Sequence, residues 1–394
     1  MSATRTDVLI AGAGLAGART AETLRAAGFD GRISLAGAEP HPPYERPALS
    51  KAYLLGERPA AELALRPAAF WQDAGIDLHI GAPVARVDIR ARRASLGGRV
   101  LRWRHLVLAT GARVRRLPGF EGTNVHHLRT LDDAARLGGT LVAGARLAII
   151  GAGFIGLVVA SAARRLGAAV TVVDVAPVPL AAALGETVGT RMADLACEAG
   201  VTLLMGRSVA SIDRDRGPVE RLVLDDGTVI GCDAVLVGVG ACPSGELVAT
   251  QLPVARDGAI PVDECGRTVA AGVYACGDVA ATTRCAVPLG RVEHWTSAAA
   301  GARAVAHTIM GVAPPAAAPT YFWTDQFGSR LQVVGRAAPE AEVEVEEGPG
   351  WFVARYAPRG DGSRAVALLN RPDMLATARQ EVAGAVVEAV AAVP

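Results

Sequence analysis

The sequence lacks several features that would assign it to a class at once. Its six cysteines contain no Cys-x-x-Cys pair, which gives no indication of a zinc site or of a redox-active dithiol loop. The formal net charge is only +1, so the chain has neither the basic excess of a nucleic-acid-binding protein nor an acidic tail. The one long uncharged run, LAIIGAGFIGLVVASAA at 147–163, stops short of the ~20 apolar residues that a membrane span needs. We therefore expect no metal, no nucleic acid and no membrane as partners.

The cellular location is also predicted by what is missing. The N-terminal residues lead directly into an apolar strand, without the hydrophobic region of a signal peptide. Scattered thiols are typical of proteins from a reducing compartment, so we expect a cytoplasmic protein. The 394 residues, of which 51% are hydrophobic, are enough for two or three domains with substantial cores.

The strongest pattern that is present is an internal repeat of strand, G-x-G-x-x-G, helix and strand. The first glycine permits a sharp turn, the second lets a pyrophosphate approach the backbone, and the third lets the helix pack closely on the strand. The helix N-terminus then offers N–H groups and partial positive charge to the diphosphate. Two copies in one chain predict two dinucleotide sites. The glycines are Gly12, Gly14 and Gly17 in the first copy and Gly151, Gly153 and Gly156 in the second.

A carboxylate at the end of the second strand of such a unit accepts hydrogen bonds from ribose hydroxyls and repels a 2′-phosphate. Asp174 has this place in the second copy, which favours NAD over NADP. In the first copy the only nearby carboxylate is Glu39. A solvated loop carboxylate is the alternative for both residues, and the residues alone leave it open.

Two further strands are expected to return to the first unit. Residues 106–111, LVLATG, end in the small-residue turn Ala109-Thr110-Gly111, and residues 272–280, GVYACGDVA, contain the turn Gly277-Asp278. The carboxyl ends of strands border the crevice in which such sheets bind ligands, so Asp278 is placed to hydrogen-bond a polyol. The alternative is a Gly-Asp turn that binds nothing.

These patterns predict an α/β fold with two Rossmann-type nucleotide-binding domains built on parallel sheets. Turn-rich spans at 81–104 and 206–232 predict small antiparallel insertions. A linker-like segment at 312–319 precedes a C-terminal α+β domain, which opens with YFWTDQFGSRLQVVG and ends in a helical tail at 380–393.

Several motifs together resemble one family. YERPALSK at 44–51, RVEHW at 291–295 and YFWTDQFGSRLQVVG at 321–335, with the two glycine units, ATG and GVYACGD, are similar to the FAD-dependent NADH:ferredoxin reductases of the putidaredoxin-reductase-like type. These serve bacterial oxygenases and haem-thiolate monooxygenases, and the family includes rubredoxin reductases. The resemblance implies a FAD-binding domain of residues 1–112 and 240–318, a NAD-binding domain of 113–239 and a C-terminal interface domain of 319–394.

The resemblance also implies roles for single residues. Lys51, in a loop stiffened by Pro43 and Pro47, is expected near the reactive edge of the flavin as an electrostatic catalytic group. Trp323 is expected beside the flavin, and the helix that begins near Trp295 is expected to direct its N-terminus at the ring. The residues expected to bind FAD or NAD are Gly12, Gly14, Leu15, Ala16, Gly17, Glu39, Arg46, Lys51, Val84, Ala109, Thr110, Gly111, Arg129, Gly151, Gly153, Phe154, Ile155, Gly156, Asp174, Gly240, Gly277, Asp278, Glu293, His294, Trp295 and Trp323.

The chain departs from the family pattern in places. The family commonly has a glutamate as the lysine's partner where this chain has Val158, and often an aspartate where it has Ala38. The implied reaction is hydride transfer from NADH to FAD, followed by single-electron transfer to a ferredoxin, with a transient complex and a monomeric or weakly dimeric enzyme. Part of the ferredoxin docking surface is expected at Arg113, Arg115, Arg116 and Arg330.

Two other functions remain open at this point. An NADH oxidase, peroxidase or disulfide reductase of the same fold would act through a cysteine, yet no cysteine precedes Cys197. A flavin-binding scaffold or redox sensor with impaired turnover is the second alternative, and the valine at 158 is the feature that suggests it.

Overall fold

A computed structural model describes residues 4–213, 217–284, 287–290, 293–316, 318–358 and 363–391. The chain divides into two compact units. The first is built from residues within Met1–Glu45, Ala61–Arg113 and Ala241–Ala317, and the second from residues within Arg46–Ala60, Val114–Gly240 and Ala318–Pro394. Cys285, the first two residues of the RVEHW motif at 291–292 and the end of the C-terminal tail lie outside the described residues.

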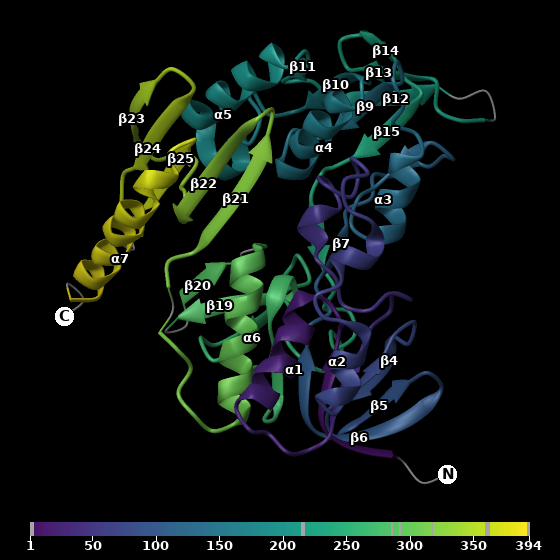
Figure 1. The fold of residues 1–394 in the computed structure, drawn as a ribbon, viewed down its shortest axis with the longest axis vertical. Helices are drawn as coiled ribbons and strands as arrows, with labels where there is room; N and C mark the ends of the chain where they lie inside the picture. Colours follow the sequence, from purple (N-terminus) through teal and green to yellow (C-terminus); the bar gives the residue numbers. More distant parts are fainter. Residues whose placement is uncertain are drawn as a thin grey trace. The chain divides into compact units, whose positions relative to one another are not determined.

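The first unit contains the first glycine repeat in a parallel sheet. Strand β1 pairs in parallel with β2 on one side and with β6 on the other, and β18 pairs in parallel with β6. Helices α1 and α6 lie side by side (Figure 1). The main elements are β1 (Thr4–Ala11), α1 (Leu15–Ala26), β2 (Ile33–Ala36), α2 (Ala68–Asp73), β3 (Ile76–His79), β6 (Arg99–Leu108), β18 (Val273–Ala275), η3 (Gly277–Val279) and α6 (Trp295–Ile309).

Val8, Leu9 and Ile10 of β1 are all fully buried. A strand of a parallel sheet is buried on both faces, which is why its sequence is a continuous apolar run rather than an alternating one. Smaller elements extend this unit: β4 (Val84–Asp88) and β5 (Arg93–Leu96) form an antiparallel insertion with β6, and β7 (Ala112–Val114) pairs with β16 (Ala241–Pro243). The remaining elements are η2 (Ala60–Leu63), β17 (Ile260–Val262), β19 (Ala280–Arg284) and β20 (Val287–Gly290).

The second unit contains the second repeat in another parallel sheet, with the strand order β11-β10-β9-β15-β8. The run 147–163 is divided here between a strand, a glycine turn and a helix; among the described residues no helix is long and apolar enough to cross a membrane. The elements are η1 (Arg46–Ala48), β8 (Val125–His126), α3 (Leu131–Gly138), β9 (Arg146–Ile150), α4 (Phe154–Arg165), β10 (Ala169–Asp174), α5 (Ala181–Glu198), β11 (Thr202–Met205), β12 (Val209–Asp213), β13 (Arg221–Leu224), β14 (Val229–Gly231) and β15 (Ala234–Val237).

The C-terminal part of this unit is a five-stranded antiparallel sheet with one long helix. Its strand order is β21-β22-β25-β24-β23. Leu331, Phe352 and Tyr356 of this sheet share a hydrophobic core with Leu157 of α4 and Val188 of α5. The elements are β21 (Tyr321–Gln326), β22 (Ser329–Gly335), β23 (Val343–Gly348), β24 (Trp351–Tyr356), β25 (Ala365–Leu369), η4 (Pro372–Met374) and α7 (Leu375–Ala391).

The predicted fold class is confirmed: two parallel sheets, antiparallel insertions and a C-terminal α+β part are all present. The insertion strands β4 and β5, and β12 to β14, fall within the predicted spans, whereas β6 continues beyond residue 104 into the parallel sheet. The C-terminal helix begins at Leu375, earlier than predicted from 380, because η4 leads into it with a proline in the first turn.

Candidate functional site

The first glycine turn joins β1 to α1, and its glycines meet different surroundings. A Cβ atom on Gly12 would lie 2.0 Å from the carbonyl oxygen of Ala109, and one on Gly17 would lie 1.9 Å from that of Gly12. Neither position can hold a larger residue. A Cβ on Gly14 would have no neighbour within 4 Å. Packing within the protein therefore does not demand glycine at Gly14, whereas the close approach of a ligand would.

The second glycine turn, between β9 and α4, repeats this arrangement. A Cβ on Gly151 would lie 2.5 Å from the carbonyl oxygen of Gly238, and one on Gly156 would lie 2.0 Å from that of Gly151. At Gly153 a Cβ would again meet nothing within 4 Å. The two repeats thus share both the tight positions and the open one.

The helices after these turns begin without a side-chain cap. Gly14 and Gly153 are the N-cap residues of α1 and α4, neither cap receives a side-chain hydrogen bond, and neither first turn contains an acidic residue. The positive ends of both helices are thus not neutralised by their own side chains. Open space at the middle glycine and uncapped N–H groups fit a diphosphate at each turn.

Asp174 lies at the end of β10 and contacts the second turn. Its Oδ2 accepts a hydrogen bond from the backbone N–H of Ala152 at 2.6 Å, and its Oδ1 accepts one from Ala176 at 2.8 Å. The carboxylate therefore stabilises the turn and remains at the strand end where a ribose is expected. In the first unit Glu39 follows β2 and accepts a hydrogen bond from the Tyr44 hydroxyl.

The other turns of the first unit reach the same edge of its sheet. Ala11 of β1 is in register with Leu108 of β6, which is in register with Ala275 of β18. The turns that follow these residues therefore end beside Gly12. The Thr110 hydroxyl donates to the carbonyl oxygen of Ser244 at 2.6 Å and fixes the second of these turns.

The start of α6 contributes a buried histidine. His294 is the N-cap residue of this helix, and Trp295 is its first residue. Burial lowers the pKa of His294 to about 4, although the nearby carboxylate of Asp278 acts in the opposite direction. His294 is therefore neutral at pH 7 and can donate one hydrogen bond and accept another.

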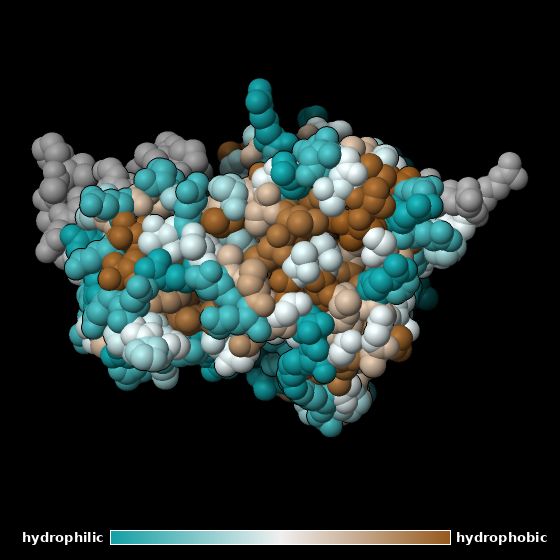
Figure 2. Space-filling model, turned by 90° about the horizontal axis from the view of Figure 1, so that it is seen from above, coloured by the Kyte–Doolittle hydropathy of each residue, from teal (hydrophilic) through white to brown (hydrophobic). Residues whose placement is uncertain are grey.

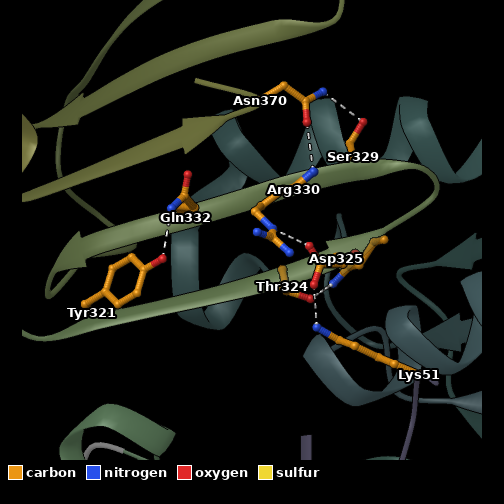
Figure 3. A network of polar contacts seen from close by, with 9 residues as sticks. Lys51, Tyr321, Thr324, Asp325, Ser329, Arg330, Gln332 and Asn370 are labelled. Atoms are coloured by element: carbon orange, nitrogen blue, oxygen red, sulfur yellow. Dashed lines mark hydrogen bonds and ion pairs between the residues drawn. The ribbon is translucent and has the colours of Figure 1, made fainter. Parts of the chain in front are cut away.

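Lys51 belongs to the second unit, within 46–60. It is the only lysine among the 40 Lys and Arg residues of the chain. Its Nζ lies 3.0 Å from Oδ2 of Asp325, and Oδ1 of the same carboxylate accepts a hydrogen bond from Arg330 Nε at 2.6 Å (Figure 3). Asp325 comes from β21 and Arg330 from β22, directly opposite each other in the hairpin.

The β21–β22 hairpin is held firmly in its own unit. The backbone N–H of Phe327, in its turn, donates to the Ser161 hydroxyl of α4 at 2.7 Å. The Phe322 ring contacts Phe154 of the same helix edge to face, with ring centroids 5.0 Å apart. The hairpin residues are therefore fixed against the helix that begins at the second glycine turn.

The remaining expected residues are divided between the two units. In the second unit Arg46 donates to the carbonyl oxygen of Arg129 at 2.5 Å, and the Trp323 ring stacks on Tyr321 with centroids 5.8 Å apart. The first unit holds Gly12, Gly14, Leu15, Ala16, Gly17, Glu39, Val84, Ala109, Thr110, Gly111, Gly277, Asp278, Glu293, His294 and Trp295; the second holds Arg46, Lys51, Arg129, Gly151, Gly153, Phe154, Ile155, Gly156, Asp174, Gly240 and Trp323.

Two of the four arginines expected in a docking surface are paired within the chain. Arg330 donates to Asp325, and Arg113 lies 3.2 Å from Glu246. Their charges are partly compensated, which leaves Arg115 and Arg116 as the stronger candidates of that set for an acidic partner.

On the face that Figure 2 shows, a large hydrophobic area is bordered by hydrophilic side chains, and smaller hydrophobic spots lie elsewhere. Two of the exposed large hydrophobic residues adjoin the second nucleotide motif: Ile155 is 45% exposed and Val175 is 74% exposed. Apolar surface next to a glycine turn fits the flat face of a nucleotide base.

Asp325 was not among the residues predicted from the sequence, although it lies in the motif YFWTDQFG. A signal was available. The lysine of the resembled family commonly has an acidic partner, this chain lacks that partner at position 158, and Asp325 is a carboxylate in one of the shared motifs. Val158 itself is a buried residue of α4, with 5% of it exposed.

The chain is similar to known proteins along most of its length. Residues 6–302 match the pyridine nucleotide-disulphide oxidoreductase family, and residues 321–393 match the reductase C-terminal family. The chain is 40% identical to rhodocoxin reductase of Rhodococcus erythropolis over 87% of this chain and 81% of that protein. It is 38% identical to the ferredoxin–NAD(+) reductase component of the p-cumate 2,3-dioxygenase system of Pseudomonas putida, over 95% of this chain and 92% of that protein.

A solved structure also matches along nearly the whole chain. The crystal structure of the covalent putidaredoxin reductase–putidaredoxin complex superimposes with a TM-score of 0.91 at 33% sequence identity, over 97% of this chain and 93% of that chain. The match includes the C-terminal sheet as well as both nucleotide-binding parts.

Proposed function

Because the chain belongs to the pyridine nucleotide-disulphide oxidoreductase family, we propose that it is a FAD-dependent NADH:ferredoxin oxidoreductase that serves an oxygenase or a haem-thiolate monooxygenase. The single observation that carries this proposal is the pair of glycine turns, one in each unit, each followed by a helix with an uncapped N-terminus. Two dinucleotides in one chain are what an enzyme needs in order to pass electrons from a nicotinamide to a flavin.

In the first unit, the turn from Gly12 to Gly17 holds the FAD diphosphate, and Glu39 and Asp278 hydrogen-bond its hydroxyl groups. In the second unit, the turn from Gly151 to Gly156 holds the NADH diphosphate. Asp174 contacts the adenosine ribose and disfavours NADPH. We assign FAD binding to residues 1–112 and 240–318, NADH binding to 113–239, and an interface role to 319–394.

FAD, when bound, would supply the chemistry that connects the two-electron oxidation of NADH to the one-electron reduction of an iron–sulfur protein. The residues of the chain orient the cofactors and stabilise charge on the flavin. The Lys51 ammonium stabilises negative charge, the N-terminus of α6 adds positive potential, and Trp323 excludes water from the ring. No side chain is required as a general acid or base.

Two of the thiols that the structure describes are poorly suited to the cysteine-dependent alternative. Burial raises the pKa of Cys232 and of Cys276 to about 11, and no disulfide joins the described cysteines. A buried thiol with a raised pKa is a poor nucleophile. Neither Cys232 nor Cys276 is therefore a candidate for the catalytic cysteine that such an enzyme needs.

The partner is an acidic ferredoxin that docks transiently, with Arg115 and Arg116 among the residues that attract it. The enzyme is cytoplasmic and is a monomer or a weak homodimer. Relatives named for dioxygenase systems support an oxygenase downstream.

The test is reduction of candidate [2Fe–2S] ferredoxins by the purified yellow protein, with NADH and NADPH compared at equal concentrations. We expect rapid turnover with NADH and much slower turnover with NADPH. A bound flavin that stays oxidised at millimolar NADH would favour the scaffold alternative, and a protein purified without flavin would overturn the proposal.

A further inference from the structure

Lys51 is chemically singular in this chain. Every other Lys or Arg position is an arginine, and surface ion pairs such as Arg146–Asp233 and Arg371–Asp373 use the guanidinium. Arginine presents a rigid planar fork, whereas lysine presents a compact ammonium with three donors on a flexible stem. A simple structural ion pair would be served equally well by arginine, so the ammonium at this position indicates a different requirement.

A flexible stem does not place its charge by itself, and Asp325 supplies the restraint. Its two carboxylate oxygens are divided between two donors, with Arg330 on Oδ1 and Lys51 on Oδ2. The Lys51 side chain is 25% exposed, that of Asp325 38% and that of Arg330 58%. The Lys51 side chain is therefore the least exposed of the three, and the Arg330 side chain is the most exposed.

Further hydrogen bonds fix Arg330, which holds the Asp325 carboxylate. The backbone N–H of Arg330 donates to the Asn370 side chain at 2.8 Å (Figure 3). The Asn370 amide in turn donates to the Gly350 carbonyl oxygen at 2.8 Å. A chain of hydrogen bonds thus runs from the end of β25 through β22 and β21 to Lys51. Burial of Asp325 opposes ionisation, but the hydrogen bonds from Arg330 and Lys51 outweigh it and lower the pKa of this carboxyl, so it is charged at neutral pH.

We propose that Asp325, clamped by Arg330, is the positioning carboxylate of Lys51, so that the C-terminal hairpin sets where the only ammonium side chain of the enzyme lies. This inference rests on the proposed function for the role of the ammonium at the flavin, but the pairing itself does not depend on it. Asp325 acts through Lys51 and is a positioning residue.

The single lysine makes the pairing directly measurable. Acetylation of the FAD-loaded protein by an amine-selective ester modifies Lys51 and the N-terminal amine, and peptide mass mapping separates the two. We expect Asp325→Asn to accelerate Lys51 acetylation about tenfold, which lies within the range of coupling between contacting residues. Arg330→Gln should give a smaller increase, because Asp325 then loses its clamp. Glu347→Gln removes the Arg191–Glu347 pair in the same unit and is the matched control.

Flavin reduction by NADH in a stopped-flow instrument gives the functional readout. Asp325→Asn should slow reduction at saturating NADH about tenfold with FAD content unchanged, and Lys51→Gln should do the same. The double variant should be no slower than Lys51→Gln alone, because Asp325 acts only through the lysine. The flavin midpoint potential should move in the same direction in both single variants, which a purely structural contact would not cause.

The outcomes test separately whether Asp325 pairs with Lys51 and whether this pairing positions the ammonium for flavin reduction. Unchanged acetylation in both Asp325→Asn and Arg330→Gln would overturn the pairing. Accelerated acetylation with unchanged reduction rate and potential would overturn the positioning role, as would effects of the two single variants that multiply in the double variant. A wild-type protein whose flavin NADH does not reduce would overturn the proposed function, while the acetylation rates would still decide whether Asp325 holds Lys51.

Discussion

Asp174 is hydrogen-bonded to the backbone N–H of Ala152 at 2.6 Å, and so connects the end of β10 to the second glycine turn. The same carboxylate caps Ala176 with its other oxygen. The geometry of this turn and, in the proposed function, recognition of the ribose therefore depend on one side chain.

Asp174→Asn should weaken NADH binding, because the neutral amide accepts more weakly and one of its two polar atoms is a donor. We expect the KM for NADH to rise about tenfold with a smaller effect on kcat. Steady-state kinetics with a saturating electron acceptor measure both the KM for NADH and kcat. Asp263→Asn is the control, since the Oδ1 of Asp263 also accepts two backbone N–H groups, from Cys265 and Arg267, in the other unit. An equal rise of KM in both variants would contradict the assignment.

Substitutions at two glycines of the second turn should affect protein stability and NADH binding separately. Gly156→Ala places a Cβ 2.0 Å from a carbonyl oxygen and should destabilise the protein by about 3 kcal/mol or more. Gly153→Ala meets no neighbour within 4 Å and should fold normally while losing most of its affinity for NADH. Urea unfolding and NADH titration of the flavin absorbance measure the two effects. Full NADH affinity in Gly153→Ala would show that the diphosphate does not approach this residue.

Stability should fall in mild acid because of His294. The folded protein holds its pKa at about 4, below the ordinary value near 6.5, so between these values the unfolded chain binds a proton that the folded chain does not. Stability from this residue is complete above pH 6.5 and decreases as the pH falls toward 4, by about 1–3 kcal/mol. Urea midpoints of the wild type and of His294→Gln at pH 7.5 and 5 measure it. The wild type should lose more stability than the variant, and parallel losses would exclude His294 as the cause.

The buried thiols should be inert and dispensable for catalysis. Cys276 is 2% exposed with its pKa raised to about 11 by burial. We expect iodoacetamide at pH 8 to modify Cys197, which is exposed, long before Cys276. Cys276→Ala should retain NADH-dependent flavin reduction within about twofold. A large loss of reduction with FAD content intact would revive the cysteine-dependent alternative.

Much of the fold was predictable because its signals are local. Gly17 and Gly156 are demanded by the carbonyl oxygens of Gly12 and Gly151 in their own turns, so the G-x-G-x-x-G spacing alone predicts the two βαβ units. The carbonyl oxygens that demand glycine at 12 and 151 belong to Ala109 and Gly238, which only the fold brings close. The C-terminal helix was predicted to begin too late, since the 3-10 helix η4, which contains the proline and lies outside the apolar pattern, leads into it at Leu375.

Sequence alone determined both dinucleotide turns, the acidic residue at the end of β10 and the single lysine, because each is a matter of residue type at short spacing. Only the tertiary structure decided that Lys51 pairs with Asp325, 274 residues away, and that Arg330 is the clamp of that carboxylate rather than a freely available docking charge. Such a pairing depends on how a hairpin packs on α4 through Ser161 and Phe154, and no local pattern contains that information. Because position 158 is a valine, the sequence did not show which residue pairs with Lys51. The structure shows that the partner is Asp325 of β21.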